Sequence, residues 1–301
     1  MSFTAKLINL GIKMSGLKKK YDLPEEQFLA EARKMNETRG FFMPKNNRAV
    51  YREHVVKGHQ VLLVQKAEKP SERAILYFFG GGMVIGPDKG DVDVVAQLVN
   101  ETGCDVWFPY YPLCTDYCIT ESYEMAYECY RQMIELYGTG NVSTCGFSSG
   151  GALALGIAAH NNAQQNKLPQ PRHIVAVSPG EVPWNDAERE IMQKNDPKDM
   201  EVSYSFMARG EKFMLHGKAD VPDYMIHISK GDFTGVPDIH FYWSEDEVLY
   251  GAKQNFIDAC ERSGVKYTIK TRPGMIHCYP MLPQFREAKE DFKEICGYLA
   301  K

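Results

Sequence analysis

Residues 142–151, with the sequence VSTCGFSSGG, decide the fold of this chain. A short apolar run ends at Cys145, the pentapeptide Gly146-Phe147-Ser148-Ser149-Gly150 follows, and a segment rich in small residues extends to Gln165. This order predicts a strand, a sharp turn that lifts Ser148 out of a sheet, and a helix that begins directly after the turn. Because the glycines on either side have no Cβ, backbone and neighbouring elements can approach the turn closely. Ser148 is therefore a candidate nucleophile, and a tight turn without chemistry is the alternative.

The chain around this turn alternates short apolar runs with longer amphipathic segments. That alternation is typical of a parallel sheet flanked by helices. We therefore expect an α/β protein with a mostly parallel central sheet. The predicted strands are 74–79, 105–109, 142–145, 173–178, 239–243 and 266–271, and the predicted helices are 91–102, 123–137, 149–165, 248–263 and 284–300.

Two regions do not follow the alternation: residues 1–50, before the sheet, and an insertion at about residues 183–235. Open α/β sheets bind their ligands at the carboxyl ends of the strands. We expect the two regions to form one helical lid over that edge, with the catalytic domain spanning residues 51–301. The apolar side chains of the insertion indicate either a substrate pocket or the core of the lid itself: Tyr204, Phe206, Met207, Phe213, Met214, Tyr224 and Met225.

The N-terminal segment has Phe3, Leu7, Leu10, Met14 and Leu17 on one helical stripe. A helix docked in the lid is favoured over a helix that lies on a membrane surface. The lysines within and after the stripe, and the absence of a small-residue cleavage site, argue against a secretory signal. No apolar run is long enough to cross a bilayer. We therefore expect a cytoplasmic protein without stable membrane insertion.

The composition argues against several other classes of protein. A chain of 301 residues, 44% of them hydrophobic, can bury a full core without disulfides. A net charge of -4 gives no electrostatic reason to expect a nucleic-acid partner. The eight cysteines lack the spacing of a zinc ribbon, so reduced and buried thiols are favoured. We predict no metal and no cofactor, and the sequence leaves a homo-oligomer open.

A serine hydroxyl attacks at neutral pH only when a general base removes its proton. His277 is the favoured base, because it ends the loop Pro273–His277 that follows predicted strand 266–271. The base needs an acid, and strand 239–243 is followed by three carboxylates, of which at least two are expected to be solvated. They are Glu245, Asp246 and Glu247, and the remaining histidines are expected to be satisfied core or surface residues: His54, His59, His160, His173, His216, His227 and His240.

The order serine, acid, histidine is that of α/β hydrolases. Ester cleavage also needs preset amides where negative charge develops on the carbonyl oxygen. Gly80-Gly81-Gly82 follows predicted strand 74–79, and the amides of Gly80, Gly81 and Ser149 are the candidates for this oxyanion hole. A phosphate-binding loop is disfavoured, because no Lys-Ser/Thr pair and no Gly-x-Gly-x-x-Gly spacing accompany the glycines.

Taken in order, these motifs resemble those of the hormone-sensitive-lipase-like esterases of the α/β-hydrolase superfamily. The resemblance covers residues from about 60 to 300 and implies a lidded ester hydrolase that acts on short or medium acyl chains without a cofactor. Its motifs are the oxyanion segment Tyr77–Gly86, the strand end Tyr111-Pro112-Leu113, the serine turn Gly146–Gly150, the acid loop Glu247–Tyr250 and the base loop Pro273–His277.

The resemblance also ranks individual residues. It implies that Glu247 is the acid, with Asp246 as the reserve choice. Phe79 stands where the family usually has histidine, and Phe147 where its serine turn often has aspartate. Because the oxyanion donors are backbone amides, neither change removes the chemistry. Phe79, Met83 and Phe147 are candidate residues of the substrate pocket, and packing in the core is the alternative for Phe79.

The sequence therefore predicts a serine carboxylesterase in which Ser148 attacks a small acyl ester. Two hypotheses remain beside it. An amide, formamide or lactone hydrolase would use the same triad, and the sequence does not separate these bonds. A ligand-binding protein without activity on a hydrolase scaffold is the third hypothesis, motivated by Phe79 and the bulky lid.

Overall fold

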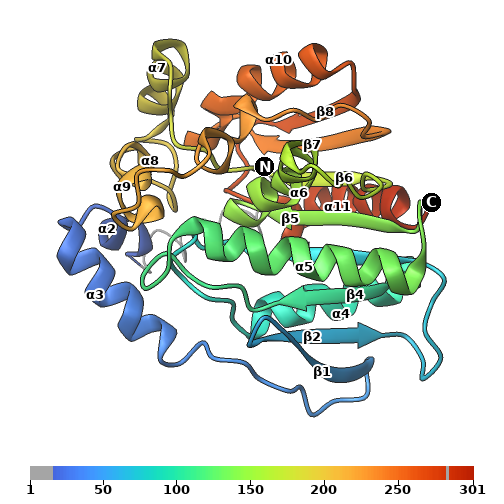
Figure 1. Ribbon diagram of the computed structural model, residues 1–301. Helices are drawn as coiled ribbons and strands as arrows, with labels where there is room; N and C mark the ends of the chain where they lie inside the picture. The colour runs from blue at the N-terminus through green and yellow to red at the C-terminus, as the bar shows by residue number, and fades with distance from the viewer. Residues whose placement is uncertain (1–15, 283–284) are drawn as a thin grey trace.

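The strands predicted around the serine turn lie side by side in one sheet. In the computed structural model, which describes residues 16–282 and 285–301, eight strands form this sheet in the order β1-β2-β4-β3-β5-β6-β7-β8 (Figure 1). From β4 to β8 neighbouring strands are parallel, and β1 and β2 are antiparallel, which confirms the mostly parallel sheet. The strands are β1 (Val50–Val56), β2 (His59–Gln65), β3 (Ala74–Phe78), β4 (Asp105–Pro109), β5 (Val142–Phe147), β6 (Ile174–Val177), β7 (Asp238–Ser244) and β8 (Lys266–Arg272).

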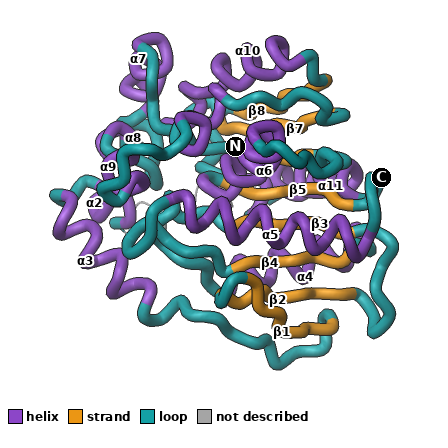
Figure 2. Tube along the Cα trace, in the orientation of Figure 1, coloured by secondary structure: helices purple, strands orange, loops and turns teal. Residues whose placement is uncertain are grey.

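Helices cover both faces of the sheet. Figure 1 shows α5 and α6 on one face, and α4 and α11 on the other, and Figure 2 shows the same layers coloured by secondary structure. The helices are α2 (Leu17–Tyr21), α3 (Glu25–Asn36), α4 (Lys89–Thr102), α5 (Ile119–Tyr137), α6 (Ser149–Ala163), α7 (Asp186–Asn195), α8 (Tyr204–Ala208), α9 (Gly210–Leu215), α10 (Lys253–Ser263) and α11 (Arg286–Leu299), with 3-10 turns η1 (Asp223–Met225), η2 (Ile228–Lys230), η3 (Val248–Ala252) and η4 (Tyr279–Met281).

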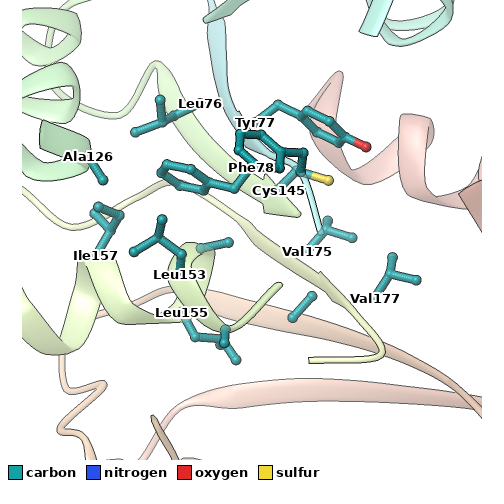
Figure 3. Close-up of a cluster of buried hydrophobic side chains, with 14 of the residues drawn as sticks. Leu76, Tyr77, Phe78, Ala126, Cys145, Leu153, Leu155, Ile157, Val175 and Val177 are labelled. Atoms are coloured by element: carbon teal, nitrogen blue, oxygen red, sulfur yellow. The ribbon is translucent and has the colours of Figure 1, made fainter. Parts of the chain in front are cut away.

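The central strands are apolar along their whole length because both of their faces are covered. Every residue of β3, β4 and β6 is buried. Figure 3 shows Leu76 and Phe78 of β3 pointing toward Leu153 and Ile157 of α6, whereas Tyr77 points to the opposite face. A continuous apolar run is what such a doubly covered parallel strand requires. The strongest strand predictions from the sequence therefore correspond to the middle of the sheet.

The hairpin of β1 and β2 is not predicted by the sequence pattern. Its strands pair from Val50 with Gln65 to Val56 with His59. The two connecting residues, Lys57 and Gly58, have φ of 50° and 81°, which two-residue hairpin turns with the twist of the strands require. The strand β1 lies at the sheet edge and only its last residue is buried, so charged residues interrupt its apolar pattern. The Lys-Gly pair between two runs of β-branched residues was the available signal.

The N-terminal segment and the insertion contact each other at the carboxyl ends of the strands (Figure 1). The ring centroid of Phe206 in α8 lies 4.6 Å from that of Tyr21 and 5.3 Å from that of Phe28. Arg209 donates hydrogen bonds to the carbonyls of Tyr21 and Leu23. These contacts join two segments that are far apart in the sequence. The division into a lid and a catalytic domain stays a prediction.

Two predictions about the chain ends have different outcomes. The predicted apolar stripe lies outside the described residues, except for Leu17, which begins α2. The predicted C-terminal helix is present as α11. Among the helices of residues 16–282 and 285–301, none is long and apolar enough to cross a membrane. All eight cysteines are free and buried, as predicted.

Candidate active site

Ser148 occupies the sharp turn between β5 and α6. Its φ of 54° and ψ of -128° are rare for a residue with a side chain, and they lift it out of the line of the strand. The Ser148 amide donates to the Val177 carbonyl over 2.9 Å, and the Ser148 carbonyl accepts from the amides of Ala152 and Gly180, each over 3.1 Å. These backbone hydrogen bonds stabilise the strained turn, whose conformation costs about 1–3 kcal/mol.

The two glycines of the serine turn are required by close backbone contacts. A Cβ on Gly150 would lie 2.2 Å from the Phe78 carbonyl oxygen, and one on Gly146 would lie 2.2 Å from the Gly150 carbonyl oxygen. Real side chains do not approach backbone this closely. The glycines therefore let α6 begin directly against the end of β3, which brings Ser148 beside the glycine loop.

The loop Gly80-Gly81-Gly82 lies against Ser148. A Cβ on Gly80 would lie 3.1 Å from the Ser148 Cβ, and Gly81 has a φ of 108°. Among residues 16–282 and 285–301, no hydrogen-bond acceptor faces the amides of Gly80, Gly81 or Ser149. Tyr111 donates from its hydroxyl to the Phe79 carbonyl over 2.8 Å and so anchors the start of the loop. Three unused amides beside a serine can together stabilise an oxyanion.

His277 is paired with Glu247. The Glu247 Oε2 lies 2.5 Å from His277 Nδ1, and both side chains are buried. The reserve acid Asp246 contacts Lys198 and the Gly274 amide instead. The geometry therefore brings Glu247, and not Asp246, to the base.

Buried donors fix the Glu247 carboxylate. Its Oε1 accepts from the Ser178 hydroxyl over 2.8 Å and from the Ser244 amide over 2.9 Å. Behind it, the Asp199 carboxylate of the insertion accepts from the Val248 amide over 2.8 Å. The sequence analysis missed these supports. Of the three, Ser178 lay at the end of predicted strand 173–178.

The Cys278 thiol contacts the ring nitrogen of His277 that faces away from Glu247. Its Sγ lies 3.3 Å from His277 Nε2, and the part of the chain that the structure describes has no hydrogen bond between Ser148 and His277. Burial lowers the pKa of His277, but the contacts with Cys278 and the Glu247 carboxylate outweigh it and raise that pKa above the ordinary value. Burial raises the pKa of the Cys278 thiol. Nothing in the sequence, beyond its position next to His277, indicated that the Cys278 thiol would contact the imidazole.

Ser148 and His277 line the same cavity, which has a volume of about 780 Å³. The candidate pocket residues Met83 and Phe147 also line it. Phe79 does not line it, so of the two places predicted for this residue the structure corrects the pocket in favour of the core. Its ring stacks on Tyr111 with centroids 4.1 Å apart and is buried in the core, because the neighbouring strand ends offer it further aromatic rings. The other cavity walls include Phe206, Met207, Phe213, Met214 and Met225 of the insertion.

Acidic residues in the cavity wall were not predicted. Asp88, Asp91, Asp93 and Glu201 line the cavity. The Oε1 of Glu201, in the insertion, is buried and has no hydrogen-bond partner among the residues that the structure describes. Burial raises the pKa of Glu201 to about 7, opposed by the charge of His277. The Glu201 amide donates to Asp199 over 2.9 Å, which ties the residue to the support of the acid loop. The insertion therefore contributes a buried carboxyl, as well as apolar side chains, to the cavity wall.

The fold and this site define an α/β hydrolase, and comparisons with known proteins agree. A family model described as alpha/beta hydrolase fold matches residues 75–281, so the chain belongs to that family. An acetyl-hydrolase of Streptomyces hygroscopicus is 24% identical over 244 residues, which are 78% of this chain and 79% of that protein.

Solved structures share the fold over nearly the whole chain. An esterase/lipase from an uncultured bacterium is 19% identical, with a TM-score of 0.81 over 99% of this chain and 98% of that one. An esterase from the bacterial hormone-sensitive lipase family is 19% identical, with a TM-score of 0.79 over 97% of each chain. The resemblance drawn from the sequence motifs is confirmed at the level of family and fold, and the protein is a hydrolase of this class.

Proposed function

We propose that the protein is a serine carboxylesterase in which Ser148 is the nucleophile, His277 the general base and Glu247 the acid that orients the base. One observation carries the proposal. The buried Glu247–His277 pair and the strained Ser148 turn meet at one cavity, beside the unused amides of the glycine loop. The groups that would touch the ester, which are Ser148, His277 and the amides of the glycine loop, thus line that cavity, and Glu247 supports His277 from behind.

The proposed reaction has two halves. The Ser148 Oγ attacks the ester carbonyl while His277 Nε2 takes its proton, and the amides of Gly80, Gly81 and Ser149 stabilise the oxyanion. His277 then protonates the departing alkoxide, and a water molecule activated by the same nitrogen releases the acid. His277 Nε2 must give up its contact with the Cys278 thiol to receive the Ser148 proton.

The walls of the cavity support acyl esters of short to medium chain. Several methionine and phenylalanine side chains line it, and a cavity of about 780 Å³ lies within the range of small-molecule sites. The relative named acetyl-hydrolase supports a small acyl group. We further propose that residues 16–49 and the insertion act as one lid, because their aromatic side chains pack together above Ser148. The eight free, buried thiols support a reducing compartment such as the cytoplasm.

Hydrolysis of p-nitrophenyl acetate, butyrate, octanoate and palmitate tests the proposal, with Ser148→Ala as the matched variant. We expect turnover on the shorter esters that vanishes in the variant, and covalent labelling of Ser148 by an organophosphonate. Matched amides should react far more slowly. Labelling without ester turnover would favour an amide or lactone hydrolase, and the loss of both would favour a ligand-binding protein.

A further inference from the structure

A second cluster of reactive side chains lies at the opposite edge of the sheet from Ser148. The register pairs Ile174 of β6 with Ile239 of β7, so His173 lies opposite Asp238, and His240 is two residues further along on the same face. Six steps of about 3.3 Å place this cluster about 20 Å from the acid loop at the other end of β7. It cannot belong to the proposed catalytic site.

The ligand atoms of the cluster converge. One atom from each of His173, Asp238 and His240 lies within 4.8 Å of the other two. Asp238 Oδ1 is 3.2 Å from His240 Nε2 and 2.6 Å from His173 Nδ1. Tetrahedral Zn²⁺ with bonds of about 2.0–2.1 Å keeps neighbouring ligand atoms about 3.3 Å apart. The distance between Asp238 and His240 fits such an ion. The distance between Asp238 and His173 must lengthen by several tenths of an ångström when the proton that these two groups share leaves.

The histidines are oriented as metal ligands usually are. Thr268 of β8 contacts His240 Nδ1 over 2.8 Å, and the ring of Tyr298 in α11 stacks on His240 with centroids 3.5 Å apart. These contacts fix the ring and leave Nε2 facing Asp238, as outer contacts do in metal sites. The Nε2 atoms of His173 and His240 are buried and have no hydrogen-bond partner within residues 16–282 and 285–301.

Charge and access also suit a divalent ion. The Asp238 side chain is 30% exposed and gives solvent access, whereas that of His240 is only 4% exposed. Lys301 lies over the Tyr298 ring, 5.1 Å from its centroid, and its charge opposes a bound cation. The single carboxylate and two imidazoles outweigh that charge, since they supply direct ligands.

We propose that His173, Asp238 and His240 form a zinc-binding site with one position open to water. Two imidazoles and one carboxylate are ligands that zinc accepts. The ion joins the start of β6 to the start of β7 and therefore stabilises the sheet at the edge away from the catalytic cavity. This site is independent of the esterase proposal.

Zinc binding to the untagged, chelator-stripped full chain tests the site. A chromophoric zinc chelator in competition at pH 7.5 should report one Zn²⁺ per chain. His173→Gln and His240→Gln should each weaken this binding at least tenfold, while His54→Gln, a half-buried histidine on β1, should leave it unchanged. Thermal unfolding without zinc checks that each variant is folded, and zinc should raise the melting temperature of the wild type but not of His240→Gln.

A second possible zinc site must be distinguished, because the catalytic cavity contains the His277–Cys278 contact. X-ray absorption of the zinc-loaded protein should show nitrogen and oxygen ligands without sulfur. No stoichiometric binding would overturn the proposal. Binding that persists in the folded His173→Gln/His240→Gln double variant and disappears in Cys278→Ala would also overturn it and place the ion in the catalytic cavity.

Discussion

Replacing Glu247 by Gln tests the acid of the triad most sharply. In the structure, Glu247 Oε1 accepts from the Ser178 hydroxyl and the Ser244 amide, and Oε2 faces His277 Nδ1. The Ser244 amide cannot turn away, so the glutamine oxygen must take the Oε1 place and its NH2 group must face His277. Two donors cannot face each other. The imidazole proton therefore moves to Nε2, where it blocks acceptance of the Ser148 proton.

The expected loss follows from this wrong tautomer. Amide replacement of the acid in a serine triad lowers turnover by roughly 10⁴-fold, so we expect kcat/KM to fall by about 10³–10⁴-fold, which is about 4–5.5 kcal/mol at 1.36 kcal/mol per tenfold. Loss of the carboxylate also lowers the pKa of His277, which Glu247 helps to raise. The acid limb of the kcat/KM profile should thus move to lower pH.

The assay is hydrolysis of p-nitrophenyl butyrate between pH 5 and 9, with thermal unfolding as the check on folding. Asp246→Asn is the matched control, because Asp246 lies on the same loop and its carboxylate contacts Lys198 and the Gly274 amide instead of His277. A folded Glu247→Gln protein that loses less than tenfold in kcat/KM would refute the reasoning. An equal loss in Asp246→Asn would refute it as well.

Three further predictions concern the supports of the site. Gly150→Ala should lower the free energy of unfolding by more than about 3 kcal/mol, because its Cβ would overlap backbone of β3, whereas Gly297→Ala, exposed in α11, should raise it by up to about 1 kcal/mol. Denaturant unfolding measures both, and equal effects would contradict the packing argument. Glu201 has its pKa raised to about 7 by burial, above the unfolded value of about 4.3, so the fold loses stability as pH rises from about 4 to about 7 and the loss is complete above 7. Glu201→Gln should therefore melt higher than the wild type at about pH 9 and nearly equally at about pH 4, and a difference that does not change with pH would argue against a buried carboxylate with a raised pKa. Cys278→Ala should keep or increase ester turnover, because it leaves the Nε2 of His277 free. A loss of more than tenfold in the folded variant would mean that the thiol takes part in the reaction.

Local patterns in the sequence were enough for the central architecture. The continuous apolar run of β3 and the small-residue helix after Ser148 are properties of neighbouring residues, and they follow from burial on both faces of a parallel sheet. The edge hairpin of β1 and β2 was not predicted, because charged residues interrupt the apolar residues of a partly exposed edge strand and leave no such continuous signal.

The sequence by itself determined the order of the motifs, and with it the serine turn, the glycine loop and the histidine loop at one edge of the sheet. Only the tertiary structure decided which carboxylate reaches His277, because Asp246 and Glu247 are adjacent and differ in direction rather than in position along the chain. The tertiary structure also decided that the Phe79 ring packs in the core and not in the pocket. The cluster of His173, Asp238 and His240 depends on the register between β6 and β7, which are more than sixty residues apart. Contacts of that kind arise from packing of distant segments, and no local pattern in the sequence encodes them.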